Sequence, residues 1–288
     1  MNAYDEAVRL LPSKMAAVLG KEHLKAEEFR LRTGIIPTAL INNAEKTIGS
    51  EPVSENDIAC VLEKATRASV HTAQPDMSKG FISCRSGIRI GICGCGIVRG
   101  GITSGIKDIS SLSIRIPHEI IGCGQGVLQA VLKDECKNIL ILSPPGGGKT
   151  TLLRESIRLL SLSGNRVAVA DERGELAAVY RGRTQFELGG CCDVMTGIPK
   201  AEAAMMLLRS MNPQTIVVDE ISSPRDIPAA RIAAGCGVRL IASAHAGGVN
   251  ELAMRPVYRQ LLDEKIFSAA IIIENNGGSR RYRCEELL

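Results

Sequence analysis

The second half of the chain alternates short apolar runs with segments that carry apolar residues at helical spacing. The apolar runs cover residues 137–142, 166–170, 215–218 and 239–243, and the helical segments cover 150–161, 201–211 and 227–234. Uninterrupted apolar strands separated by helices are typical of a parallel sheet that is buried on both faces. The pattern therefore predicts an α/β domain whose parallel sheet is flanked by helices.

The chain ends in the pattern of a β-hairpin. The largely apolar segment 269–274 is followed by Asn-Asn-Gly-Gly at 275–278 and by a second extended segment at 280–285. Asn-Gly sequences favour the tight turns that join two antiparallel strands. We therefore expect this hairpin to close the second domain.

The first half of the chain has a different pattern. Up to about residue 70 it predicts short helices around one extended piece at 26–32, and one of these helices begins at Asp57. Two alternating segments, 81–85 and 88–93, are bounded by glycines and predict a strand hairpin, and 111–117 predicts a further strand. We therefore expect a small α+β domain over residues 1–118, followed by the α/β domain over 119–288.

The composition is ordinary for a globular protein and argues against nucleic acid as a partner. The chain has 288 residues, which at roughly 150 residues per domain agrees with two domains. Aromatic residues make up 3% of the chain and Trp is absent, so few rings could stack on bases. Basic residues exceed acidic ones by only 35 − 31 = 4 charges, and no basic run is longer than Arg280-Arg281. The sequence therefore makes nucleic acid an improbable partner.

The cysteines and the opening residues indicate the compartment. The ten cysteines lack the paired spacing of a structural zinc site. The chain opens without the basic start and apolar stretch of an export signal, so we expect reduced thiols, most of them buried as small apolar residues. No run of about 18 apolar residues predicts a membrane-spanning helix. Together these features predict a cytoplasmic protein.

The strongest candidate for chemistry is a glycine-rich loop between the first strand of the α/β domain and the helix that follows. This context matches the phosphate-binding loop G-x-x-x-x-G-K-[ST], except that Ser143 replaces the first glycine. Backbone N–H groups of such a loop bind phosphate oxygens, its lysine reaches the β- and γ-phosphates, and the next hydroxyl binds Mg²⁺. The alternative is a glycine-rich loop without a ligand. The pattern predicts an ATP site formed by Ser143, Pro144, Pro145, Gly146, Gly147, Gly148, Lys149, Thr150 and Thr151, with Thr150 as a ligand of Mg²⁺.

Two carboxylates complete this candidate site. Asp219 and Glu220 directly follow the apolar strand 215–218, and ligands of open α/β sheets bind at the carboxyl ends of strands. We expect Asp219 to hold Mg²⁺ and Glu220 to orient or deprotonate the attacking water. The alternative, a pair of solvated acids, is less consistent with a phosphate-binding loop in the same sheet. An Asp followed by a Glu also favours hydrolysis over phosphoryl transfer to a metabolite.

Further polar residues follow two other strands. Asp171, Glu172 and Glu175 follow the strand at 166–170, and His245 follows the strand at 239–243. Groups at these positions can orient water or contact the γ-phosphate, so Glu175 and His245 join Lys149 and Glu220 as candidate catalytic residues. The alternatives are a surface ion-pair cluster and a structural histidine. The sequence alone leaves open which of the three acids faces the nucleotide.

The order of these motifs resembles that of the type II/type IV secretion ATPases. In that superfamily the segments matching 143–151, 171–175, 219–220 and 244–245 are called Walker A, Asp box, Walker B and His box. A closer resemblance, to the stage III sporulation family of endospore-forming bacteria, rests on residues 86–93, 108–115, 143–154 and 197–221. It covers nearly the whole chain, and Ser143 is its main departure.

The resemblance carries expectations about fold and function. It implies a P-loop NTPase fold of the RecA/AAA type and a Mg²⁺-dependent ATPase in the mother cell. This ATPase would energise or assemble a channel apparatus between mother cell and forespore. Expected partners are further copies, in a hexameric ring, and membrane-embedded channel proteins that hold the ATPase at the inner face of a membrane.

The resemblance also implies that basic residues of the small N-terminal domain reach the nucleotide. The candidates are Arg85, Arg89, Arg99 and Arg115. Strand alternation places several of them on one face. Arg115 is the first choice because its strand leads towards the ATPase domain. An arginine that reaches the γ-phosphate stabilises charge in the transition state.

Two other functions compete with the secretion-type ATPase. The first is a nucleic-acid-dependent P-loop ATPase, which the low aromatic content and mild charge disfavour. The second is a nucleotide-binding switch or assembly scaffold. Glu220 argues against the switch, because a switch does not need an acid that activates water.

Overall fold

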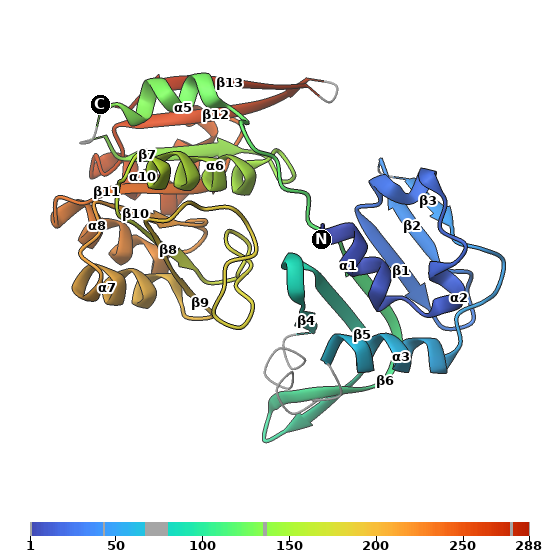
Figure 1. Ribbon diagram of the computed structural model, residues 1–288. Coiled ribbons are helices and arrows are strands. Elements are labelled where there is room, and N and C mark those ends of the chain that lie inside the picture. Colours follow the sequence, from blue (N-terminus) through green and yellow to red (C-terminus); the bar gives the residue numbers. More distant parts are fainter. Residues whose placement is uncertain (1, 43, 67–79, 135–136, 277–278, 288) are drawn as a thin grey trace. The chain divides into compact units, whose positions relative to one another are not determined.

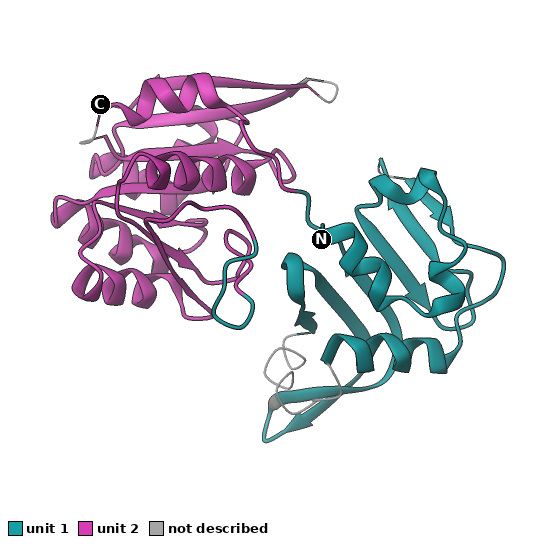
Figure 2. Ribbon diagram, in the orientation of Figure 1, with its two compact units in different colours: residues 1–118, 180–185 teal, residues 119–179, 186–288 magenta. Residues whose placement is uncertain are grey.

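The computed structural model describes residues 2–42, 44–66, 80–134, 137–276 and 279–287 (Figure 1). The chain divides into two compact units (Figure 2). Unit 1 comprises residues 1–118 and 180–185, and unit 2 comprises residues 119–179 and 186–288.

Unit 1 is built on an antiparallel sheet with the strand order β3-β2-β1-β6-β5-β4. Its strands are β1 (Glu28–Arg32), β2 (Thr38–Ile41), β3 (Ala44–Thr47), β4 (Phe81–Ser83), β5 (Arg89–Arg99) and β6 (Ile102–Arg115). Its helices are α1 (Ala3–Leu10), α2 (Ser13–Ala16) and α3 (Glu55–Thr66), with 3₁₀ turns η1 (Lys21–Lys25) and η2 (Arg85–Gly87). Alternate residues such as Phe29, Leu31 and Ile114 share one buried core with α1 and α3.

Several elements of unit 1 agree with the sequence pattern. The β4–β5 hairpin, the strand at 28–32 and helix α3 are confirmed. Strands β2 and β3 contradict the expectation of one extended piece surrounded by helices. All four residues of β3 are exposed, so this strand has no apolar alternation that a sequence pattern could reveal.

Unit 2 contains a sheet with the strand order β13-β12-β7-β11-β10-β8-β9, in which only β13 is antiparallel to its neighbour. Its strands are β7 (Ile139–Ser143), β8 (Val167–Asp171), β9 (Cys192–Thr196), β10 (Thr215–Val218), β11 (Arg239–His245), β12 (Ala269–Asn276) and β13 (Ser279–Glu286). Its helices are α5 (Gln125–Leu132), α6 (Lys149–Leu162), α7 (Lys200–Ser210), α8 (Ile227–Gly235), α9 (Val249–Met254) and α10 (Pro256–Asp263), with a 3₁₀ turn η3 (Pro224–Asp226).

Both faces of this sheet are covered. On one face, the row Ile139, Ile241, Val217 and Val169 crosses four neighbouring strands and packs with residues of α5 and α6. On the other face, Leu140, Ala242 and Ile216 pack with α7, α8 and α10. This double burial explains the continuous apolar strands and confirms the predicted α/β fold class. It also brings the carboxyl ends of β7, β8, β10 and β11 to one edge.

The expected burial of the cysteines is wrong for the residues that the structure describes. Of these, only Cys84 is buried, whereas Cys93, Cys95, Cys191, Cys236 and Cys284 are exposed. Cys191 directly precedes the edge strand β9, Cys284 lies in the edge strand β13 and Cys236 follows α8, so these three lie outside the apolar runs that form the core. Within the described ranges, no helix is long and apolar enough to cross a membrane. Cys136 and the glycines of the predicted turn at 277–278 lie outside the described residues.

Candidate active site

The loop between β7 and α6 has a backbone that only glycine accommodates well. Gly146 and Gly148 have φ values of +74° and +103°, in the left-handed region that side chains disfavour. A Cβ at Gly147 would collide with the side-chain oxygen of Ser143 and lie 2.9 Å from its Cβ. Ser143 is fully buried, and its hydroxyl donates to the carbonyl of Pro144 at 2.7 Å. The serine that departs from the motif therefore closes the loop on itself.

Lys149, His245 and Glu220 form a chain of polar contacts beside this loop. His245 lies opposite Ser143 in the ladder between β11 and β7, which brings its ring to the first residue of α6. Lys149 Nζ lies 2.6 Å from His245 Nδ1, and His245 Nε2 lies 3.0 Å from Glu220 Oε2. An ammonium group only donates, so Nδ1 accepts and Nε2 donates its proton to Glu220. Burial lowers the pKa of Lys149, and the charge of Glu220 opposes that shift.

Asp219 opens on a small cavity at the same sheet edge. The cavity has a volume of about 30 Å³, and Thr150, Glu175, Lys200, Asp219 and Glu220 are among its lining residues. Within the described residues, the buried Oδ1 of Asp219 accepts no hydrogen bond. Burial raises the pKa of Asp219 to about 6, against the opposing charge of Lys200. Lys200 Nζ lies 3.5 Å from this Oδ1, beyond hydrogen-bond reach, and Asp219 and Thr150 line the same cavity. A carboxylate and a hydroxyl at one cavity are oxygen ligands that fit a hard cation such as Mg²⁺.

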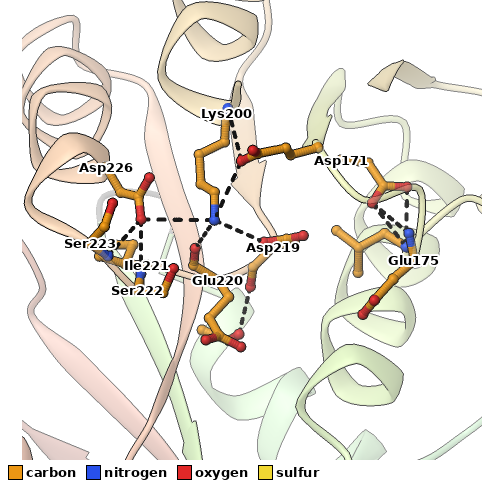
Figure 3. Close-up of polar contacts among 12 residues, drawn as sticks. Asp171, Glu175, Lys200, Asp219, Glu220, Ile221, Ser222, Ser223 and Asp226 are labelled. Atoms are coloured by element: carbon orange, nitrogen blue, oxygen red, sulfur yellow. Dashed lines mark hydrogen bonds and ion pairs between the residues drawn. The ribbon is translucent and has the colours of Figure 1, made fainter. Parts of the chain in front are cut away.

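The three acids at the end of β8 have separate positions, and Figure 3 labels Asp171 and Glu175. The Asp171 carboxylate is fully buried and accepts hydrogen bonds from the backbone N–H groups of Glu175, Leu176 and Ala177. Burial raises the pKa of Asp171 despite these hydrogen bonds. Glu172 forms an ion pair with Lys200 at 3.8 Å, and Glu175 lines the cavity. Asp171 therefore shapes the loop, and Glu175 is the acid of the three that lines the cavity.

Comparison with known proteins assigns the chain to a family. The family model described as "Sporulation stage III, protein AA" matches residues 1–284. The chain belongs to this family. "Stage III sporulation protein AA" of Bacillus subtilis is 34% identical over 272 residues, which cover 91% of this chain and 88% of the relative.

Solved structures show the fold of this sporulation stage III AA family member. The Legionella pneumophila ATPase DotB matches with a TM-score of 0.61 and 16% identity, over 98% of this chain and 78% of DotB. The pilus retraction motor PilT, solved with bound ADP, matches with a TM-score of 0.60 and 18% identity, over 91% of this chain and 78% of PilT. The fold is that of the P-loop NTPases among the secretion ATPases.

Lys200 belongs to the candidate site of this family member, although the sequence pattern did not predict it. Its buried ammonium lies 3.5 Å from Asp219, 3.8 Å from Asp226 and 3.8 Å from Glu172, and it donates to the backbone carbonyl of Glu220 (Figure 3). Lys200 thus connects the ends of β8 and β10 with η3. It is the first residue of α7, where a positive charge opposes the helix dipole. This unfavourable placement of a charge is the feature of the sequence that could have indicated Lys200.

Arg154 of α6 is a second residue that the pattern did not single out. Its guanidinium donates to the backbone carbonyls of Glu175 and Leu176, both at 2.9 Å, and lies 3.7 Å from the centre of the Phe186 ring. These contacts attach the loop that contains Glu175 to helix α6, whose first residue is Lys149. Arg154 is therefore a positioning residue of the candidate site.

Arg115 lies in unit 1, at the end of β6. It is opposite both Glu28 of β1 and Arg89 of β5, so the two arginines share a face of the sheet. Its side chain is exposed and forms an ion pair with Glu28 at 3.6 Å. The expectation that Arg115 reaches a nucleotide stays a prediction.

Proposed function

We propose that this protein is a Mg²⁺-dependent ATPase that acts in endospore formation. The single observation that carries the proposal is the chain from Lys149 through His245 to Glu220, which runs beside a glycine loop and a cavity lined by Asp219. A cation for phosphate, a base for water and an oxygen ligand for a metal are the groups that ATP hydrolysis requires.

In this proposal the loop and the start of α6 bind the triphosphate. Backbone N–H groups of residues 143–151 and the ammonium of Lys149 would hold the phosphate oxygens. Thr150 and Asp219 would hold Mg²⁺, which when bound neutralises charge on the phosphates. The PilT motor, which shares this fold, was solved with bound ADP, and this supports a nucleotide as the ligand.

Glu220 and His245 would act on the attacking water. Glu220 is partly exposed and lines the cavity, so its carboxylate can accept a proton from a water held there. The hydrogen bond from His245 fixes the direction of that carboxylate. Glu175, whose backbone carbonyl accepts a hydrogen bond from Arg154, also lines the cavity and would orient the same water. Lys200 would hold Asp219 in place without contacting the nucleotide.

The cellular role in this proposal rests on the family and on the neighbours in fold. The family description names sporulation, and the neighbours are named as an ATPase and a pilus motor. A cytoplasmic ATPase of the mother cell would then energise or assemble a channel to the forespore. It would work as a hexameric ring held at the inner face of the membrane by membrane-embedded sporulation channel proteins.

Two measurements on the purified protein test this function: an assay of ATP hydrolysis, and light scattering with and without ATP. We expect phosphate release that depends on Mg²⁺, and a rise in molecular mass when ATP is added. Activity should increase with membrane-channel partners. An increase with nucleic acid alone would instead support the nucleic-acid-dependent ATPase.

A mixing experiment tests the ring. Arg115→Ala should bind ATP nearly normally but hydrolyse it at least about 10³-fold more slowly, as expected for loss of an arginine that reaches the γ-phosphate. Excess Lys149→Ala protein, which keeps Arg115, should restore part of that activity. If mixing restores nothing and the wild-type protein stays monomeric at every concentration with ATP, the ring is wrong.

A further inference from the structure

The side chain of Arg280, near the start of β13, packs against the glycine loop. A Cβ placed on Gly148 would lie 3.1 Å from both Cζ and Nε of Arg280 and 3.4 Å from Nη1. Gly148 directly precedes Lys149 and is the N-cap of α6. The guanidinium therefore lies against the backbone that the proposed function assigns to phosphate.

The register of the C-terminal hairpin explains this position. β12 runs parallel to β7, with Ile272 opposite Leu142, so the residues after Ile273 extend past the end of β7 beside the loop. In β13, Arg280 lies opposite Asn275 and Tyr282 lies opposite Ile273. Ile273 and Tyr282 belong to the core that includes α5 and α6. Residues two apart on a strand share a face, so Arg280 lies on the α6 side of the hairpin.

Arg280 brings a positive charge to this point. Within the part of the chain that the structure describes, no ion pair or hydrogen bond joins Arg280 to another residue. In contrast, Arg283 of the same strand pairs with Glu274 at 3.3 Å. The start of α6 carries a partial positive charge of its own, and Lys149 adds a full one. Three positive groups side by side repel one another unless an anion lies among them.

The order of the strands indicates which part of the anion Arg280 contacts. β12 and β13 lie on one side of β7, whereas β11 and β10, which lead to His245 and Glu220, lie on the other. A triphosphate whose γ-phosphate lies near Glu220 has its nucleoside end directed towards β12. We infer that Arg280 binds the phosphates next to the nucleoside, so that the C-terminal hairpin is part of the nucleotide-binding site. This inference rests on the proposed function and deepens it.

The inference predicts a specific effect on affinity. An arginine on the phosphates that ATP and ADP share should strengthen the binding of both nucleotides equally, and should leave the hydrolytic step unchanged. Charge-assisted hydrogen bonds of this kind correspond to about a 10- to 100-fold change in the dissociation constant.

The test compares Arg280→Ala with Arg281→Ala. Arg281 is the next residue of β13, so it lies on the opposite face, away from α6. Its alanine variant loses the same charge and is therefore the matched control. Calorimetry should show both ATP and ADP binding about 10- to 100-fold more weakly to Arg280→Ala, with kcat at saturating ATP kept. Arg281→Ala should match the wild-type protein, and Arg280→Lys should fall between them. Thermal unfolding without nucleotide checks that each variant is folded.

Three outcomes would overturn the inference. Unchanged affinity in Arg280→Ala would show that the guanidinium does not contact the nucleotide. A loss confined to ATP, with a lower kcat, would place Arg280 at the γ-phosphate instead. Equal losses in both alanine variants would indicate a general effect of surface charge. If calorimetry shows that the wild-type protein binds neither nucleotide, the proposed function itself is wrong. Calorimetry of the wild-type protein therefore separates failure of the proposed function from failure of this inference.

Discussion

His245 Nδ1 lies 2.6 Å from Lys149 Nζ, so the last residue of β11 and the first residue of α6 share one hydrogen bond. The other ring nitrogen of His245 lies 3.0 Å from Glu220. The Lys149 ammonium has three N–H donors, of which the Ser143 carbonyl and His245 Nδ1 accept two, so the third can reach a phosphate while both bonds of His245 persist. His245 therefore links the group proposed to bind phosphate to the group proposed to activate water.

Replacing His245 should separate binding from turnover. In His245→Ala, Lys149 loses one acceptor but keeps the ammonium that would bind phosphate, and Glu220 loses the donor that orients it. We expect the dissociation constant for ATP to change by less than roughly threefold and kcat to fall about 10-fold or more. Titration calorimetry and steady-state kinetics measure the two. His118→Ala, at an exposed histidine of unit 1, is the control and should change neither.

Glu220→Gln should have a larger effect on the chemical step. Glutamine keeps the shape and accepts the hydrogen bond from His245, but it cannot take a proton from water. ATP affinity should survive while turnover falls about 10²-fold or more. Glu202→Gln, at an exposed position of α7, serves as the control. Parallel losses of affinity and turnover in Glu220→Gln would instead indicate a ligand of the metal.

The contact between Ser143 and Gly147 predicts the result of a double substitution. A methyl group at Gly147 collides with the Ser143 side chain, so Gly147→Ala should distort the loop and weaken ATP binding. Ser143→Gly removes the colliding atoms, although the Pro144 carbonyl stays 3.1 Å from the added carbon. We therefore expect Ser143→Gly/Gly147→Ala to recover part of the lost affinity. No recovery would show that the contact with Pro144 alone decides the effect.

The buried position of Lys200 predicts a large effect on stability. Lys200→Met would leave Asp219 and Asp226 close together without their cation. Removing one partner of a buried ion pair costs about 3–5 kcal/mol, so the unfolding temperature should fall clearly. Lys133→Met, at an exposed residue, provides the matched control in thermal denaturation. An unfolding temperature equal to that of the wild-type protein would mean that Lys200 is not needed to hold these acids.

The parallel sheet and the central residues of the candidate site could be predicted because their signals are local. A strand buried on both faces has to be apolar along its whole length, and a tight phosphate loop needs glycines at fixed positions. Strand β9 gave no such signal, because it lies at the sheet edge and none of its residues is fully buried. Helices α9 and α10 are short, and the pattern did not predict them.

Residues whose surroundings come from distant segments could not be predicted. Lys200 meets acids from the ends of β8 and β10 and from η3, which are brought together only by the fold. The pair Arg280-Arg281 was visible as a basic run. Which of the two faces α6 depends on the register of β12 on β7, and no sequence pattern reveals that register.

Phosphate release by the wild-type protein and by Lys149→Ala tests the central claim most directly. The wild-type protein should hydrolyse ATP with Mg²⁺ present, because the Lys149 ammonium stabilises phosphate charge in the ground and transition states. In Lys149→Ala, hydrolysis should fall at least about 100-fold, and ATP binding should weaken sharply. Equal turnover by the two proteins would contradict the assignment of this loop as the site of ATP hydrolysis.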